Sequence, residues 1–160
     1  SPLLDPSTAR AARRAAQRAR RFIADEQTTA FADLMAEVVE SAADLDLELT
    51  HVLRMRADPP PEVGRVLASA AREALNNVAR HAGNPQGVHL YAVADDDGVV
   101  IVVRDRGRGF SPGPAHHGGG MSRSFAAVER HGGDYEIDSP PGGGTKVTIR
   151  WRRPARGEEL

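Results

Sequence analysis

The sequence contains no cysteine, so disulfide bonds and thiolate metal sites are excluded. Aromatic residues make up 4% of the chain, which argues against the stacking platforms that bind single-stranded nucleic acid. No apolar run approaches the roughly 20 residues that a membrane-spanning helix needs. A formal net charge of −1 is typical of a globular protein, and we expect no direct contact with nucleic acid. The 160 residues fit one domain with a real core and an appended helix or two.

One stretch, Arg72 to Ala82, carries polar side chains at helical spacing. On a helix of about 3.6 residues per turn, one face holds Glu73, Asn77, Arg80 and His81. The neighbouring face is apolar and continues a hydrophobic period formed by Val63, Leu67, Ala70, Ala74 and Val78. Polar groups beside a buried surface are costly unless they have partners, so the stripe indicates a site. Taken alone, it also fits the solvated side of an amphipathic helix.

Three glycine-containing motifs follow this stretch. They are Asp105-Arg106-Gly107-Arg108-Gly109-Phe110, Gly118-Gly119-Gly120-Met121 and Gly142-Gly143-Gly144-Thr145. Each motif alone is compatible with an ordinary turn or strand start. In this order, the helical stripe and the three motifs resemble the N box and glycine boxes of the ATP-binding domain of sensor histidine kinases. These domains belong to a superfamily that also contains gyrase, heat-shock chaperones and mismatch-repair ATPases, and the resemblance covers roughly residues 31–153.

The resemblance implies ATP as cofactor and indicates which residues would bind its adenine end. Asp105 would accept a hydrogen bond from the adenine amine, the main contact that selects adenine. Gly107 and Gly109 would let the backbone turn closely beneath the ligand. Gly144 and Thr145 would support the same end of the nucleotide.

The resemblance also implies roles for the helical stripe. Asn77 matches the family's single protein ligand to Mg²⁺, an ion that prefers oxygen ligands and keeps several waters. Glu73 would orient a metal-bound water and assist transfer of the γ-phosphate, which makes it the expected catalytic residue. Arg80 and His81 would lie beside the phosphates. For His81, at the end of a helix, the alternative is that it only caps carbonyl groups.

The second glycine motif is expected to bind phosphate. Gly118 and Gly120, with Met121, precede a predicted helix, and backbone N–H groups at a helix start favour negative charge. This segment departs most from the family pattern, because Arg123 stands where the related subfamily has a later glycine. Arg123 either adds a phosphate contact or crowds the loop.

The hydrophobic pattern predicts an α/β fold, a two-layer sandwich of a mixed β-sheet covered by three α-helices, plus an N-terminal basic helix. The expected helices are 7–24, 28–43, 61–82 and 122–130, and the expected strands are 47–55, 88–94, 99–104, 135–138 and 146–151. We expect residues 1–27 to belong to or follow the phospho-acceptor region, 28–153 to form the ATP-binding domain and 154–160 to be a disordered tail.

The resemblance implies a protein histidine kinase of two-component signalling that transfers the γ-phosphate to a histidine outside this chain. His51 lies in strand-like alternation rather than on an exposed helix, so we reject it as the acceptor, and autophosphorylation of the fragment is not expected. The implied partners are a phospho-acceptor histidine domain of the same or a partner chain, a response regulator, and a second copy in the full-length homodimer. The chain begins with Ser, which fits a fragment, and a cytoplasmic location is expected, in a sensor that can be anchored by membrane spans outside it. Two alternatives are an anti-sigma-factor serine kinase and a non-catalytic nucleotide-sensing interaction module.

Overall fold

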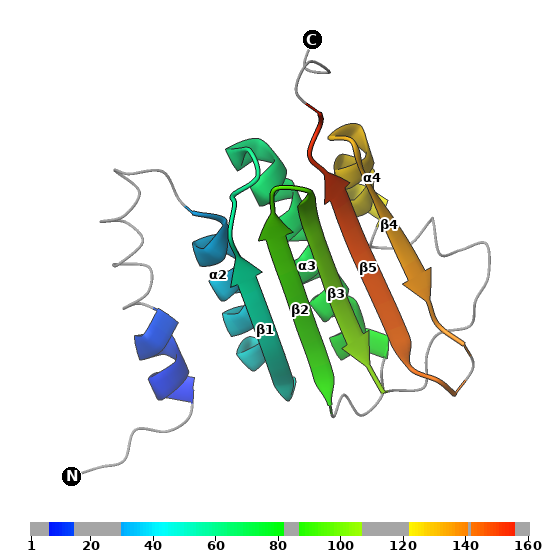
Figure 1. Ribbon diagram of the computed structural model, residues 1–160. Coiled ribbons are helices and arrows are strands. Elements are labelled where there is room, and N and C mark those ends of the chain that lie inside the picture. The colour runs from blue at the N-terminus through cyan, green and yellow to red at the C-terminus, as the bar shows by residue number, and fades with distance from the viewer. Residues whose placement is uncertain (1–6, 15–29, 82–86, 107–121, 141, 156–160) are drawn as a thin grey trace.

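The computed structural model describes residues 7–14, 30–81, 87–106, 122–140 and 142–155. Its five strands are β1 (Leu49–Met55), β2 (Val88–Asp95), β3 (Gly98–Asp105), β4 (Gly133–Asp138) and β5 (Thr145–Arg152). They form one sheet in the order β1-β2-β3-β5-β4 (Figure 1). Strand β1 runs parallel to β2, and the other neighbouring pairs are antiparallel. The predicted mixed sheet is therefore confirmed.

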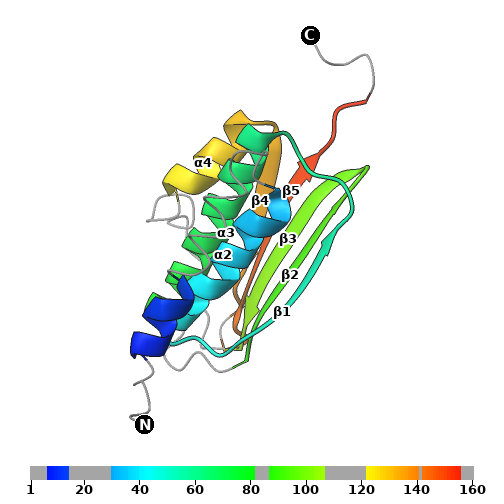
Figure 2. The same cartoon turned by 90° about the vertical axis from the view of Figure 1, so that its left-hand side faces the viewer.

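The helices α2 (Phe31–Asp44), α3 (Pro61–His81) and α4 (Ser122–Arg130) lie together on one face of this sheet (Figure 2). Residues 7–14 form a further short helical segment beside α2, and residues 15–24 of the predicted basic helix lie outside the described residues. This arrangement confirms the predicted two-layer sandwich. None of the helices in the described ranges is both long enough and apolar enough to cross a membrane.

The core lies between α3 and the inner face of the sheet. Helix α3 buries the predicted apolar stripe, with Leu67, Ala70 and Ala74 essentially inaccessible to solvent. The central strands alternate, so that every second side chain of β2 and β3 points into this core. Because the helical and strand periods both match the sequence pattern, local preference and packing favour the same fold.

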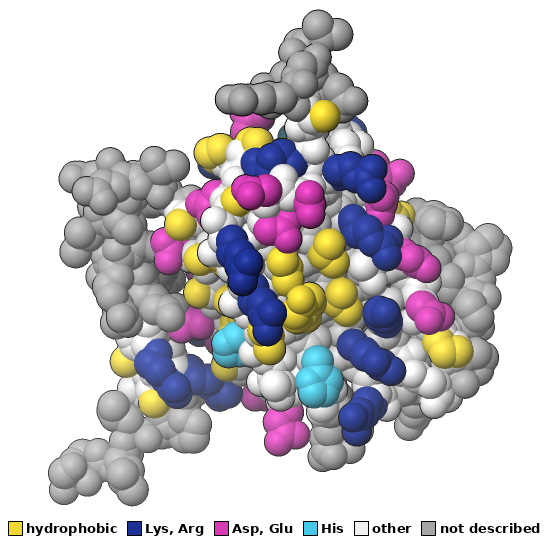
Figure 3. All heavy atoms as spheres, in the orientation of Figure 1, with side chains coloured by type: hydrophobic (Ala, Val, Ile, Leu, Met, Phe, Trp, Pro, Cys, Tyr) yellow, Lys and Arg dark blue, Asp and Glu magenta, His cyan; other side chains and the backbone are white. Residues whose placement is uncertain are grey.

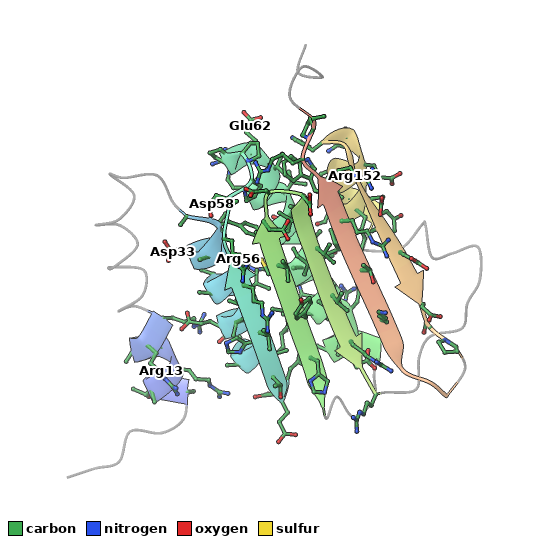
Figure 4. The ribbon with its side chains drawn as sticks, viewed as in Figure 1. Arg13, Asp33, Arg56, Asp58, Glu62 and Arg152 are labelled. Carbon is green, nitrogen blue, oxygen red and sulfur yellow. The ribbon has the colours of Figure 1, made fainter. Side chains whose placement is uncertain are left out.

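The start of α2 differs from the prediction. The helix begins at Phe31 rather than Thr28, because Ala30 is extended and its side chain provides no cap. Instead, the Phe31 N–H donates to a carboxylate oxygen of Asp58, at 3.2 Å and 27 residues away in sequence (Figure 4). A negative charge at a helix start is favourable and satisfies an otherwise unpaired donor.

Arginines join the N-terminal helical segment to the end of α2. Arg10 donates to the Ala43 carbonyl oxygen at 3.2 Å and lies 3.3 Å from the Asp46 carboxylate. Arg14 lies 3.2 Å from Asp44. Cations are favourable where a helix ends, although exposed ion pairs of this kind contribute only about 0–1 kcal/mol each. The described part of the basic helix thus packs against the domain.

Candidate functional site

The candidate site lies where α3 and β3 end and β5 begins. Both ribbon views place these three points at the same end of the domain (Figures 1 and 2). Helix α3 contacts both β3 and β5 directly. The helical stripe and the last glycine motif therefore lie at the same end of the sandwich. Asp105, the first residue of the first glycine motif, lies there too.

Asp105 is the last residue of β3 and is only 3% exposed. It pairs in register with Thr145, the first residue of β5. Gly144 has a φ of +77°, and a Cβ atom at this position would clash with the carbonyl oxygen of Asp105. Only glycine can adopt this left-handed backbone conformation so close to another carbonyl oxygen. The third glycine motif therefore packs directly on the backbone that carries the Asp105 carboxylate.

Thr145 is held by a residue that the sequence analysis did not single out. Its Oγ1 lies 3.0 Å from Oγ of Ser139, and both side chains are buried. Ser139 directly follows β4, so this hydrogen bond ties the ends of neighbouring strands together. A serine beside two prolines is an ordinary turn residue in sequence, so the only available signal was its position directly after a predicted strand.

Asn77 is only 5% exposed and lies about one turn before the end of α3. Its amide nitrogen donates to the backbone carbonyl of Glu73 at 3.1 Å. This bond leaves the amide oxygen as an acceptor, and no described residue donates to it. A buried acceptor is costly without a partner, and an amide oxygen is a ligand that Mg²⁺ accepts. The position therefore fits the predicted metal ligand.

The remaining residues of the stripe differ in burial. Glu73 is half-buried one turn before Asn77, whereas Arg80 is exposed. His81 is the last residue of α3, and its side chain lies outside the described part of the structure. The predicted ligand residues Gly107, Gly109, Gly118, Gly120 and Met121 also lie outside the described residues.

Helix α4 begins directly after the second glycine motif. Arg123 is the second residue of this helix and is exposed. Phe125 is fully buried and stacks on Tyr135 of β4, with ring centroids 4.3 Å apart. Burial, and then the charge of Glu129, raise the pKa of the Tyr135 phenol. The stacked pair fixes α4 on the sheet and so fixes the point at which the second glycine motif ends.

Residues 62–155 match the family of histidine kinase-, DNA gyrase B- and HSP90-like ATPases. The chain belongs to this family and is a histidine kinase-type ATPase domain. Family membership implies ATP as the nucleotide, in agreement with the resemblance drawn from the motifs.

Individual relatives agree with this class. The nitrate/nitrite sensor protein NarQ of Escherichia coli is 34% identical over 96 residues, which cover 58% of this chain and 16% of NarQ. The ATP-binding domain of PrrB from Mycobacterium tuberculosis is 25% identical, with a TM-score of 0.61 over 79% of this chain and 96% of that domain. The histidine kinase domain of a blue-light activated kinase from Erythrobacter litoralis shares the fold, at 21% identity and a TM-score of 0.61 over 75% of this chain and 59% of that one. The chain thus spans only a small part of the length of NarQ.

We predict that Gly144→Ala destabilises the domain by more than about 2 kcal/mol, because it adds a clash to a strained backbone. Gly142→Ala is the matched control. Gly142 has a φ of +74°, but apart from its chain neighbours no atom of the described residues lies within 4 Å of the position that a Cβ would occupy. Gly142→Ala should lower the free energy of unfolding by about 1 kcal/mol, from the backbone conformation alone. Urea denaturation of both variants measures the difference. Equal losses would show that the Gly144 contact with Asp105 is not tight.

Proposed function

We propose that this domain binds ATP with Mg²⁺ and transfers the γ-phosphate to a histidine outside the chain, in two-component signalling. The observation that carries the proposal is the buried corner formed by Asp105, Gly144 and Thr145 at the same end of the domain as Asn77. Residues 28–153 would be the ATP-binding domain, and residues 1–27 would belong to or follow the phospho-acceptor region of a dimeric cytoplasmic kinase. A response regulator would be the final partner.

The corner suits adenine recognition. A carboxylate at the edge of a core can accept a hydrogen bond from an exocyclic amine in surroundings where water competes little. The backbone pairing of β3 with β5 holds Asp105 rigidly, and the hydrogen bond with Ser139 holds Thr145 beside it. Guanine presents an acceptor where adenine presents the amine, so a carboxylate here would disfavour GTP.

The helical stripe suits the phosphate end. Bound Mg²⁺ would supply charge to offset the phosphates, and the Asn77 amide oxygen would hold it. The Asn77 bond to the Glu73 carbonyl fixes the amide orientation, so that the oxygen is the group presented. Glu73, half-buried one turn before Asn77, would orient a metal-bound water and assist transfer of the γ-phosphate. Phosphoryl transfer depends mainly on such positioning and charge stabilisation.

The acceptor histidine would come from outside this chain. His51 is an exposed residue of β1, on a strand rather than a helix. The chain spans 16% of the length of NarQ, whose name describes a sensor. A longer protein would therefore supply the signal-sensing and acceptor regions, and the Arg10 and Arg14 contacts with α2 support a connection through the N-terminal helix.

A chimaera tests the transfer reaction. The chain would be fused behind the phospho-acceptor helical hairpin of a sensor kinase and incubated with radiolabelled ATP and Mg²⁺. Acid-labile, base-stable phosphate on the hairpin supports the proposal. Acid-stable phosphate on a serine would support the anti-sigma-factor serine kinase instead, and nucleotide binding without any transfer would support the interaction module.

For Asp105→Asn we expect ATP affinity to fall by about 10- to 150-fold, because a hydrogen bond to a charged group is worth about 1.5–3 kcal/mol. Thermal stability should change little. Asp134→Asn, at a position of β4 outside the site, is the control and should leave affinity unchanged. Calorimetric titration measures both variants. Normal ATP affinity in Asp105→Asn would remove the adenine assignment.

For Asn77→Ala we expect the gain in ATP affinity that Mg²⁺ gives the parent chain to disappear, because the metal loses its protein ligand. The neighbouring Asn76 is the same residue type, is half-buried and points about 100° away around the helix. Asn76→Ala should therefore keep the Mg²⁺ dependence. Titrations with and without Mg²⁺ measure the effect, and an unchanged dependence in Asn77→Ala would place the metal elsewhere.

For Glu73→Gln in the chimaera we expect phosphate transfer to slow by about 100-fold or more, a typical loss for a general acid–base group, with ATP affinity retained. Glu62→Gln, in the exposed first turn of α3, is the control (Figure 4). Single-turnover kinetics separate transfer from binding. Transfer at the parent rate would show that Glu73 has no catalytic role.

A further inference from the structure

The outer face of the sheet is not covered by any described helix (Figure 2). The three large hydrophobic side chains that are well exposed in the described part of the chain all lie on this face. They are Val52, Tyr91 and Val100, at 45%, 41% and 37% exposure. The half-buried side chains of Val93 and Val102 lie next to them, because Val93 is opposite Val100 and Val102 is opposite Tyr91 in the strand register. Together these five residues form an apolar patch over β1, β2 and β3.

Basic side chains border this apolar patch on both sides. The strand register aligns Arg54, Val93, Val100 and Arg150 in one row across four strands, so that two cations enclose two valines. The space-filling view shows the same pattern, with hydrophobic side chains in the middle and basic ones to either side (Figure 3). Arg56 and Arg152 continue the two basic borders at one end of the face (Figure 4). Lys146 of β5 continues the second border at the other end, and Arg104 of β3 is opposite it in register.

Most of these cations are not neutralised within the described part of the chain. Arg54, Arg56, Arg104, Lys146 and Arg152 are exposed, and among the described residues none forms an ion pair or a side-chain hydrogen bond. Arg150 is the exception, because it lies 3.6 Å from both Asp134 and Glu136. Carboxylates from a partner could therefore pair with the borders without breaking contacts of this domain.

We propose that the outer sheet face binds an acidic amphipathic helix of a partner protein. The strands β1 and β5 that carry the basic borders are three strand spacings apart, or about 14 Å. A helix with its side chains is about 10–12 Å wide, so its apolar face would cover the patch while flanking carboxylates reach the arginines on each side. Ion pairs between carboxylates of the helix and the basic side chains of both borders would orient the helix along the strands.

One further feature favours a helix over a broad anionic surface. The far edge of this face, on β4, is acidic, with Asp134, Glu136 and Asp138 exposed. A flat anionic membrane would approach this edge and be repelled, whereas a helix over β1 to β3 would not reach it. A hollow of about 400 Å³ near the β2–β3 hairpin is lined by Asp95, Asp97 and Asp134 as well as by Val93, Val100 and Arg150, so carboxylates of the partner helix would lie outside it.

The test uses two synthetic helical peptides of about 18 residues, or five turns. Both have a leucine seam, flanked by glutamates in one and by lysines in the other. We expect the acidic peptide to bind the chain at least about tenfold more tightly than the basic one, and binding to weaken with salt. Amide NMR shifts should change mainly at outward positions of β1, β2 and β3.

Two double variants locate the binding surface. Arg54→Glu with Arg56→Glu should weaken binding of the acidic peptide by about tenfold or more. Arg65→Glu with Arg130→Glu makes the same charge change at exposed positions of α3 and α4, on the opposite layer, and should have little effect. Val100→Asp should also weaken binding, and ATP affinity should stay unchanged in all variants. An unchanged affinity in the Arg54 and Arg56 variant would overturn the proposal.

Other occupants of this face give different results. One such result is that the chain binds phosphatidylserine vesicles but not the acidic peptide, and that Arg54→Glu with Arg56→Glu abolishes vesicle binding. This result would identify a membrane surface and overturn the proposal. A concentration-dependent dimer in sedimentation velocity that Val100→Asp dissociates would identify a second copy, with the same consequence. Equal binding of both peptides would show that the borders give no charge selection, which would also overturn it.

Discussion

The close packing of β5 against the end of β3 is the constraint on which the site depends. Gly144 approaches the Asp105 carbonyl too closely for any side chain, and the register then places Thr145 opposite Asp105. This contact buries a carboxylate at the edge of the core, where desolvation is expensive unless the group is bonded. A site that recognises one polar group of a ligand benefits from that rigidity, because little ordering remains to be done on binding.

The helix layer completes the arrangement from the other side. α3 spans the sheet and carries Asn77 and Glu73 near its end, where it meets β3 and β5. Helix α4 begins directly after the second glycine motif and is held on the sheet by the stacking of Phe125 on Tyr135. The end of β3 and the start of α4 are thus held by the two packed layers. The outer face of the sheet is not covered by a described helix (Figure 2). The same sheet can in this way serve one ligand at its end and a different partner on its face.

Much of this was predictable from the sequence because the patterns are local. The 3.6-residue period of α3 and the alternation of β2 and β3 predicted the elements, and the ordered motifs predicted the family. The order of the strands was not predictable, since nothing in the sequence places β5 between β3 and β4. The start of α2 was predicted about three residues early, because its capping carboxylate comes from Asp58, far along the chain. Ser139 was missed for a similar reason, since its role depends on a strand pairing.

The most direct measurement is a calorimetric titration of the chain with a non-hydrolysable ATP analogue and, separately, with the matching GTP analogue, each with and without Mg²⁺. Saturable binding of the adenine nucleotide, strengthened by Mg²⁺ and much weaker for guanine, is the predicted result. A folded sample that binds neither nucleotide, or that binds both equally, would contradict the assignment of the Asp105 corner as an adenine site.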